Sequence, residues 1–426
     1  MKKTEGTSKS RSPGKKKRGA RVYLARVLLA LFALLVTSLV SDRVLALFGL
    51  SPEPRIQIAH PPDYKETVKM LEFEYVFETN GQGLRYKDIP LEKPEDEYRV
   101  FVAGDSYTEG VGVEAEQRFT ELLEKDFSKG GRVVRFVNGG ISGTGPLEYC
   151  RLFLHVGLNY DPDALLICVY ANDPSNTYYR YQARMLYEVD IKITGLGRFV
   201  YLLWPRTYMF ARHYREFREK KAQQYPDDFF ELVHARAMSL NISDQEYEAW
   251  KSRIPGDLAE AVNRGELTPV ALATGLINPQ YWKNSIDVES DLAYRKFKAM
   301  IYILEEAIRV CRERGLPVGV IYIPSPFQYH PASHDPNVLN PWRVSGVATK
   351  KKWLNEETGI QKLMAEWAKE AGIYYLDLTP AFRREAHKHV LKFPLDGHWN
   401  EVGHAAAKEA IAQWIRKENV FGVNEN

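Results

Sequence analysis

Five short apolar runs alternate with longer helical patterns along most of the chain. The runs are YRVFVA (98–103), RVVRFVN (132–138), ALLICVY (164–170), VGVIYIP (318–324) and IYYLDL (373–378). Nearly continuous apolar runs of this length are typical of strands buried on both faces, and their alternation with helices favours right-handed crossovers. The pattern predicts an α/β fold, a three-layer α/β/α sandwich around a central parallel sheet.

The helical patterns divide this domain into two sequence blocks. We expect helices over residues 115–127, after the first run, over 292–315, before the fourth, and over 403–417, where cationic residues occupy the last turn. The long segment 181–294 carries amphipathic patches but no run that would extend the sheet. We interpret this segment as a helical insertion or cap, and residues 98–180 and 295–418 as the source of the sheet.

An apolar segment near the N-terminus, residues 22–40, has Arg26 as its one charged residue and is long enough to span a bilayer. The basic residues before it favour a cytoplasmic N-terminus, with the remainder on the far side of the membrane. A cleaved signal peptide is the alternative, although the apolar region is long for one and no Ala-x-Ala site follows. The expected organisation is a basic cytoplasmic tail (1–21), a transmembrane signal anchor (22–40), a connector (41–97), a domain (98–418) and a tail (419–426).

Within the connector, residues 71–85 are typical of a hairpin that turns at Asn80 and Gly81. The formal net charge is +3, but basic residues are concentrated before residue 27, so the rest of the chain is slightly acidic. This distribution argues against nucleic-acid binding. The three cysteines form no CxxC pair and neither require nor exclude an oxidising compartment.

Polar residues follow the apolar runs at positions where a parallel sheet binds ligands, the carboxyl ends of its strands. Ser106 follows the first run in GDSYTEG, NGGISGTG (138–145) ends the second, YANDPSN (170–176) ends the third, and Asp396 and His398 follow the last. Each alone is commonly a helix cap or a turn. Together they supply a serine nucleophile, its base, a carboxylate that orients the base, and donors for an oxyanion, including Asn172.

This joint pattern resembles the SGNH hydrolases, the GDSL esterase and lipase superfamily, over residues 98–180 and 373–418. The resemblance implies a flavodoxin-like fold with Ser106 as nucleophile. It also implies that the Ser106 N–H, Gly143 and Asn172 form the oxyanion hole. Tyr170 and Ala171 stand where the family usually has glycine.

The last motif departs from the usual Asp-x-x-His of the family, because Asp396, Gly397 and His398 make an Asp-x-His. This spacing is similar to that of SGNH-type O-acetyltransferases of exopolysaccharides. The resemblance implies a membrane-anchored serine esterase that acts outside the cytoplasm, in the periplasm or beyond. It would hydrolyse an ester or transfer an acetyl group on a cell-surface or exported glycan. If the spacing cannot support a triad, Ser106 and His398 would act as a dyad.

Several alternatives and secondary assignments accompany this reading. The alternative function is a non-catalytic scaffold for polysaccharide export, and a membrane-protein or polysaccharide-machinery partner fits either function.

No cofactor is expected. His387, His389 and His398 match no metal spacing, and GGISGTG lacks the ending of a phosphate-binding loop. We expect His404, one turn into the last helix, to be exposed or capping. The candidate substrate contacts are Tyr170, Gln328, Tyr329 and Trp399.

Overall fold

The computed structural model describes residues 13–44, 59–128, 133–177, 200, 202–204, 206–208 and 228–422. Contacts within the chain divide it into two units. One unit contains residues 1–55 and 188–224, and the other contains residues 56–187 and 225–426. The predicted basic tail (1–21) and connector (41–97) lie partly outside the described residues, and so does the first part of the predicted insertion.

A five-stranded parallel sheet forms the centre of the second unit. Its strands are β3 (Glu97–Gly104), β4 (Val133–Gly140), β5 (Ala164–Tyr170), β6 (Val318–Ile323) and β7 (Tyr374–Asp377). Their order across the sheet, β4-β3-β5-β6-β7, is the flavodoxin-like order. The strands coincide with the five apolar runs, and every residue of β5 and β6 is buried. The predicted α/β fold is therefore confirmed.

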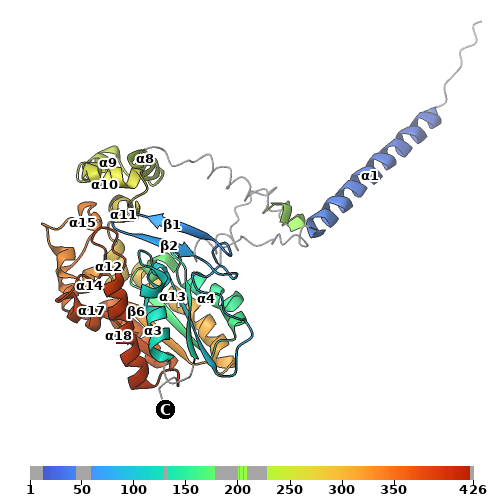
Figure 1. The fold of residues 1–426 in the computed structure, drawn as a ribbon. Helices are drawn as coiled ribbons and strands as arrows, with labels where there is room; N and C mark the ends of the chain where they lie inside the picture. The colour runs from blue at the N-terminus through green and yellow to red at the C-terminus, as the bar shows by residue number, and fades with distance from the viewer. Residues whose placement is uncertain are drawn as a thin grey trace, which may run out of the picture. The chain divides into compact units, whose positions relative to one another are not determined.

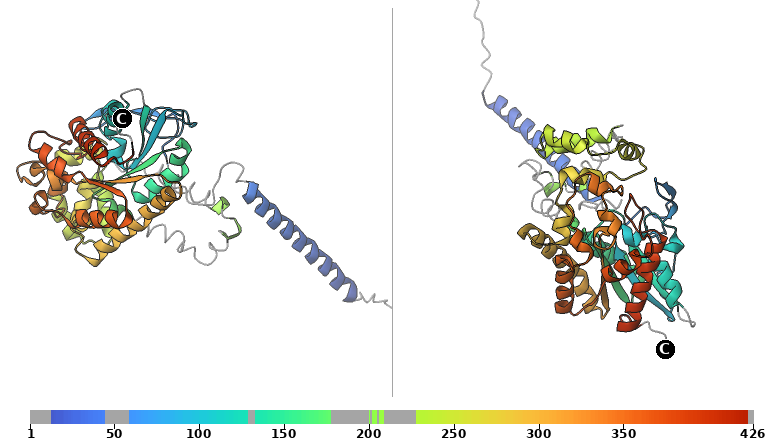
Figure 2. Two further views of the ribbon diagram at one scale, coloured as in Figure 1. Left: turned by 90° about the horizontal axis from the view of Figure 1, so that it is seen from below. Right: turned by 90° about the vertical axis from the view of Figure 1, so that its left-hand side faces the viewer.

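Helices cover both faces of this sheet, as Figures 1 and 2 show. On one face, α3 (Phe119–Phe127) packs beside α18 (Glu401–Glu418). On the other face, α4 (Pro146–His155) packs beside α13 (Asp291–Glu313), and α16 (Gly359–Ala371) packs against β6 and β7. Three further helices of the second unit are α14 (Pro326–Tyr329), α15 (Pro341–Val344) and α17 (Thr379–Ala386).

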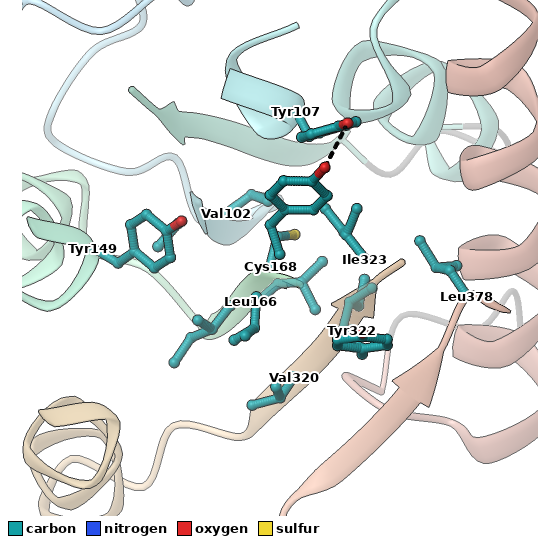
Figure 3. Packing of buried hydrophobic residues seen from close by; sticks show 14 of the residues in the cluster. Val102, Tyr107, Tyr149, Leu166, Cys168, Val320, Tyr322, Ile323 and Leu378 are labelled. Atoms are coloured by element: carbon teal, nitrogen blue, oxygen red, sulfur yellow. Dashed lines mark hydrogen bonds between the residues drawn. The ribbon is translucent and has the colours of Figure 1, made fainter. Parts of the chain in front are cut away.

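The largest hydrophobic cluster lies between the sheet and these helical layers. Figure 3 shows Val102, Leu166 and Val320 from three neighbouring strands within it. Their β-branched and aliphatic side chains suit a sheet that is covered on both faces. Val420 and Phe421 also belong to this cluster, so the predicted C-terminal tail begins as part of the core.

The predicted connector is largely folded onto the second unit. An antiparallel hairpin of β1 (Lys65–Lys69) and β2 (Glu74–Glu78) turns at residues 70–73, so the prediction of a turn at Asn80 and Gly81 is wrong. Asn80 instead shapes the loop after β2, where its side-chain oxygen accepts the N–H groups of Gln82 and Leu84. The predicted turn failed because Asn-Gly also suits a loop that leads away from a strand.

The described part of the predicted insertion is helical, with a separate small core. Its helices are α8 (Phe229–Ser239), α9 (Asp244–Lys251), α10 (Gly256–Asn263), α11 (Val270–Ile277) and α12 (Tyr281–Ile286). Trp250 is fully buried at the centre of this core, and its indole N–H donates to the carbonyl of Leu272 at 3.1 Å. The apolar positions of α8 to α11 therefore pack mainly against one another, whereas Trp282 and Ile286 of α12 belong to the largest cluster.

The first unit contains α1 (Pro13–Val44). Within α1, Val22–Val44 is the one described helical stretch that is long and apolar enough to cross a membrane. The buried carboxylate of Asp42 accepts the N–H of Thr207 at 2.7 Å, and the indole N–H of Trp204 donates to Ser38 at 3.0 Å. The end of α1 thus contacts a segment more than 160 residues further along the chain.

Candidate active site

Ser106 is the first residue of the short helix α2 (Ser106–Glu109), directly after β3. The side chain of Asp105 caps this helix by accepting the N–H of Tyr107 at 3.0 Å. At Gly104 a Cβ would lie 2.0 Å from the Thr108 hydroxyl, so only glycine allows α2 to fold back against the strand end. As the first residue of the helix, Ser106 has a backbone N–H without an intrahelical acceptor.

His398 and Asp396 lie on the loop 392–399, which we call the Asp-His loop. His398 Nε2 is 2.7 Å from Ser106 Oγ, and His398 Nδ1 is 2.5 Å from Asp396 Oδ1. The same Asp396 oxygen accepts the backbone N–H of His398 at 3.1 Å. This turn requires the positive φ of Gly397, +96°, which glycine adopts readily. The Asp-x-His spacing therefore brings serine, histidine and carboxylate into one hydrogen-bonded series.

Burial and charge act in opposite directions on this series. Burial by itself would lower the pKa of His398, but the charge and hydrogen bond of Asp396 raise it above the ordinary histidine value. Burial would raise the pKa of Asp396, but His398 holds it below the ordinary value. Each partner thus favours the charged form of the other, which is the electrostatic arrangement needed to stabilise an imidazolium. Burial raises the pKa of the nearby Asp105 to about 6.

Gly143 and Asn172 line the same cavity as Ser106. Asn172 follows β5, and the buried carboxylate of Asp173 fixes this loop by accepting the N–H of Tyr170 at 2.9 Å. The side-chain amide of Asn172 hydrogen-bonds to none of the described residues, and its Oδ1 is buried. An oxyanion can accept a hydrogen bond from the Nδ2–H2 group of this amide, but not from its oxygen.

The cavity beside Ser106 has a volume of about 230 Å³. Six Tyr, Trp and Phe residues line it, and four of them form a group of contacting rings that we call the aromatic wall: Tyr170, Tyr281, Trp282 and Trp342. The rings of Tyr281 and Trp342 stack with centroids 5.7 Å apart and an interplanar angle of 11°. Trp282 connects them to Tyr170 through edge contacts. Half of this wall comes from α12, so part of the predicted insertion borders the site.

Tyr170 is the one predicted substrate contact among the residues that line this cavity. Its hydroxyl lies 3.1 Å from that of Tyr107, which in turn lies 3.1 Å from the Gly397 carbonyl oxygen, so Tyr170 also braces the Asp-His loop. In Figure 3, the dashed line from Tyr107 marks the hydrogen bond between the two tyrosine hydroxyls.

The other three predicted substrate contacts are buried in the protein interior and are corrected here. Gln328 accepts the Tyr322 hydroxyl at 2.8 Å and donates to Thr358. Tyr329 makes an edge contact with the ring of Phe382, and Trp399 stacks on that ring with centroids 4.7 Å apart. None of the three lines the cavity. Their positions in the sequence are close to the site, but their side chains are buried in contacts with other residues.

His404 is also placed differently from the prediction. It is buried in α18 rather than exposed, and its ring stacks on Phe119 with an interplanar angle of 12°. Its Nδ1 accepts the N–H of Phe119 at 3.4 Å, which requires the neutral ring. Burial lowers the pKa of His404 to about 3. His404 therefore joins two helices and stays uncharged.

The residues at the site that the sequence analysis does not predict include Glu72 and Lys392, as well as Tyr281, Trp282 and Trp342 of the aromatic wall. Glu72 lies in the hairpin turn and accepts N–H groups of the Asp-His loop, and Lys392 lines the cavity. The side chain of Lys392 donates to the carbonyls of Phe393 and Pro394, and burial lowers its pKa to about 8. A charged residue in an apolar loop is a weak signal, because most such residues face solvent.

The chain was compared with protein families, with curated proteins and with solved structures. No protein-family model matches the chain, and no curated protein matches it.

Among solved structures, a member of the lipolytic protein G-D-S-L family from Veillonella parvula DSM 2008 aligns at 10% identity and a TM-score of 0.32. It covers 74% of this chain and 97% of its own. A catalytic mutant of an acetylxylan esterase from Geobacillus stearothermophilus aligns at 11% identity and a TM-score of 0.34, covering 75% of this chain and 94% of its own. A lipase/acylhydrolase from Enterococcus faecalis aligns at 13% identity and a TM-score of 0.33, covering 75% and 96%.

The first of these descriptions names the family that the motifs of this chain resemble. At such identities a likeness concerns the fold, and at such TM-scores it carries no further weight. The chemistry of the site therefore depends on its own residues.

Proposed function

We propose that this protein is a membrane-anchored serine esterase of SGNH type. In this proposal it acts through an acyl-Ser106 intermediate, and either hydrolyses an ester or transfers an acetyl group on a cell-surface or exported glycan. The observation that carries the proposal is the series from Ser106 Oγ through His398 to Asp396, with distances of 2.7 and 2.5 Å. A scaffold for polysaccharide export would need neither this alignment nor the opposed pKa shifts of His398 and Asp396.

The reaction begins when Ser106 Oγ attacks the ester carbonyl carbon and its proton passes to His398 Nε2. Asp396 stabilises the imidazolium and holds Nδ1–H toward itself, which leaves Nε2 free to accept. The oxyanion is met by the N–H of Ser106, the N–H of Gly143 and the amide of Asn172, which line one cavity. His398 then gives its proton to the departing alkoxide, and the acyl group remains on Ser106.

The second half of the reaction repeats this sequence with a new nucleophile. His398 accepts a proton from water or from a sugar hydroxyl, the resulting oxygen attacks the acyl-Ser106 carbonyl, and the proton returns to Ser106 as the ester bond to it breaks. Water gives a free acid, and a sugar hydroxyl gives an acylated glycan. The aromatic wall favours a sugar as the acceptor, because the apolar C–H face of a pyranose packs well on aromatic rings.

The test of catalysis uses the full chain in detergent. We expect it to release nitrophenol from p-nitrophenyl acetate and to be labelled by a fluorophosphonate, with both signals lost in Ser106→Ala and His398→Ala. Ser252→Ala is the matched control, because Ser252 is an exposed serine at the end of α9. An unlabelled wild type, or a Ser106→Ala variant as active as wild type, would refute the proposal. An acetylated donor with an oligosaccharide acceptor then distinguishes transfer from hydrolysis by the mass of the sugar product.

The proposed topology places the N-terminus in the cytoplasm and the catalytic unit outside it, with α1 as the anchor. The cysteines Cys150, Cys168 and Cys311 are all buried, so a cysteine introduced by Ser252→Cys is the accessible thiol expected in the described part of the chain. A membrane-impermeant maleimide should label this variant in intact cells. Labelling that appears only after the inner membrane is opened would reverse the proposed orientation.

A further inference from the structure

Glu72 lies in the turn between β1 and β2, more than 300 residues before the Asp-His loop that it contacts. Its carboxylate accepts the N–H of Leu395 at 3.0 Å through Oε1 and at 2.9 Å through Oε2. Oε2 also accepts the N–H of Asp396 at 2.7 Å. Hydrogen bonds to an ionised acceptor are shorter and about twice as strong as neutral ones. The hairpin therefore holds the backbone of Asp396, the residue that orients His398, by hydrogen bonds.

The Asp-His loop supplies no acceptor of its own for these two N–H groups. The hydrogen bonds between its own backbone groups run from Phe393 N–H to the His398 carbonyl at 2.9 Å and from Gly397 N–H to the Phe393 carbonyl at 3.0 Å. Within the described residues, Glu72 is the acceptor for the N–H groups of both Leu395 and Asp396. Without Glu72, the loop would keep its closing bonds and its bond from the Tyr107 hydroxyl, but the N–H groups of Leu395 and Asp396 would lose their acceptor.

The surroundings of Glu72 hold the hairpin in place for this role. The ring of Phe73 packs on Phe393 with centroids 4.7 Å apart, and the N–H of Leu71 donates to the carbonyl of Glu266 at 2.8 Å. Buried Lys392, at the base of the Asp-His loop, supplies a positive charge near the carboxylates of Glu72 and Asp396. The turn thus joins the Asp-His loop to the described part of the insertion.

We infer that Glu72 is a positioning residue that fixes the backbone of Asp396 and so sets the alignment of Asp396, His398 and Ser106. The inference rests on the proposed function. Oriented catalytic groups are sensitive to small displacements, and a shift of about 1 Å can reduce the rate by about 10². A loosened Asp396 also stabilises the imidazolium less well, so His398 becomes easier to deprotonate.

The experiment compares Glu72→Ala, Glu72→Gln and Glu74→Ala in the full chain. Glu74 is the matched control, because it lies two residues away on the same hairpin and its carboxylate is exposed beside Lys69. We expect Glu72→Ala to lower kcat by roughly 10–100-fold with KM changed less than about threefold. The acid limb of its pH–rate profile should move to lower pH. Glu72→Gln keeps one oxygen that can occupy the place of Oε2, so it should recover most of the activity, and Glu74→Ala should equal wild type.

Hydrogen exchange of the peptide containing residues 393–398 provides a readout that does not need activity. Faster exchange in Glu72→Ala, with exchange elsewhere unchanged, is the expected result. Unchanged exchange in both Glu72 variants would overturn the inference even if the protein has no esterase activity. An active wild type, an inactive Ser106→Ala and an unaltered Glu72→Ala would overturn it while leaving the proposed function intact. If Glu72→Ala fails to fold, Glu72→Asp takes its place, because a side chain one methylene shorter cannot reach both N–H groups. It should lower kcat and speed exchange of residues 393–398, and wild-type values of both would overturn the inference.

Discussion

The change of Asp396 to asparagine separates a catalytic triad from a serine–histidine dyad. Asp396 Oδ1 accepts both the backbone N–H and the ring Nδ1–H of His398. Because one oxygen accepts both, an asparagine that keeps its oxygen there preserves both bonds but lacks the negative charge that stabilises the imidazolium. An asparagine that turns its NH2 there loses the backbone bond, and His398 must then carry its proton on Nε2, where it can no longer accept the proton of Ser106. The substitution therefore removes the charge beside the base or changes its tautomer, with little change in side-chain size.

The expected magnitude follows from losing the charged group that orients His398. Comparable substitutions in serine enzymes lower kcat by about 10⁴, equivalent to about 5.4 kcal/mol at 1.36 kcal/mol for each tenfold. The pKa of His398 should also fall, because Asp396 is the group that raises it against the effect of burial. The base must be neutral to act, so the acid limb of kcat/KM against pH should move to lower pH while the plateau decreases. Hydrolysis of p-nitrophenyl acetate between pH 4 and about pH 9 measures both effects.

Asp335→Asn is the control, because Asp335 makes a similar turn by accepting the N–H of Asn337 at 2.8 Å but contacts no histidine base. It should leave kcat and the pH profile unchanged. The triad would be refuted if Asp396→Asn lost less than about tenfold in kcat and kept the wild-type acid limb. In that case Asp396 would serve the turn alone and His398 would act without an orienting carboxylate.

Three further predictions concern other parts of the molecule. Asn172→Ala should lower kcat for p-nitrophenyl acetate by about 10²–10³ with little change in KM; a loss below about threefold would remove Asn172 from the oxyanion hole. Trp342→Ala should reduce acetyl transfer to an oligosaccharide by at least about tenfold while leaving p-nitrophenyl acetate hydrolysis within about twofold, and parallel losses would contradict a sugar-binding wall. Because burial lowers the pKa of His404 to about 3 from 6.5, the folded protein binds fewer protons than the unfolded chain below about pH 6.5. Stability should therefore decrease on acidification by up to roughly 1.4 kcal/mol per pH unit from this group. His404→Asn, which can still accept the N–H of Phe119, should lose less stability between pH 7 and pH 5 in urea titrations, and an equal loss would contradict this account.

The sheet could be predicted from the sequence because its strands are buried on both faces. Such strands are apolar at nearly every position, as in ALLICVY. Ser106, Asn172 and the pair Asp396 and His398 could be found because each directly follows such a run or its loop. The structure brings all of them to one cavity. These assignments needed one fact about parallel sheets, that their carboxyl ends share an edge.

The remaining features depend on contacts between distant segments, which local patterns do not record. Glu72 looks like any hairpin glutamate until its turn is placed on a loop 323 residues away. Tyr329 follows a strand and Trp399 follows His398, which predicts contacts with the substrate, but the sequence does not state which way a side chain points. The start of a helix is usually accessible, which predicts an exposed or capping His404, whereas here Phe119 covers its ring.

The origin of the aromatic wall has a consequence for how the proposed specificity of this protein can change. Tyr281 and Trp282 belong to α12, whereas Ser106 and Asn172 directly follow strands β3 and β5 of the sheet. Helices α8 to α11 also have a small core of their own around Trp250, whereas Trp282 and Ile286 of α12 belong to the largest cluster. In the proposed function, the insertion would thus contribute to recognition of the acceptor, and residues at the strand ends would transfer the acyl group. Exchange of the segment from α8 to α12 between related chains, with the contacts of α12 to the largest cluster kept, should then alter which acceptor is used without rebuilding the reacting residues.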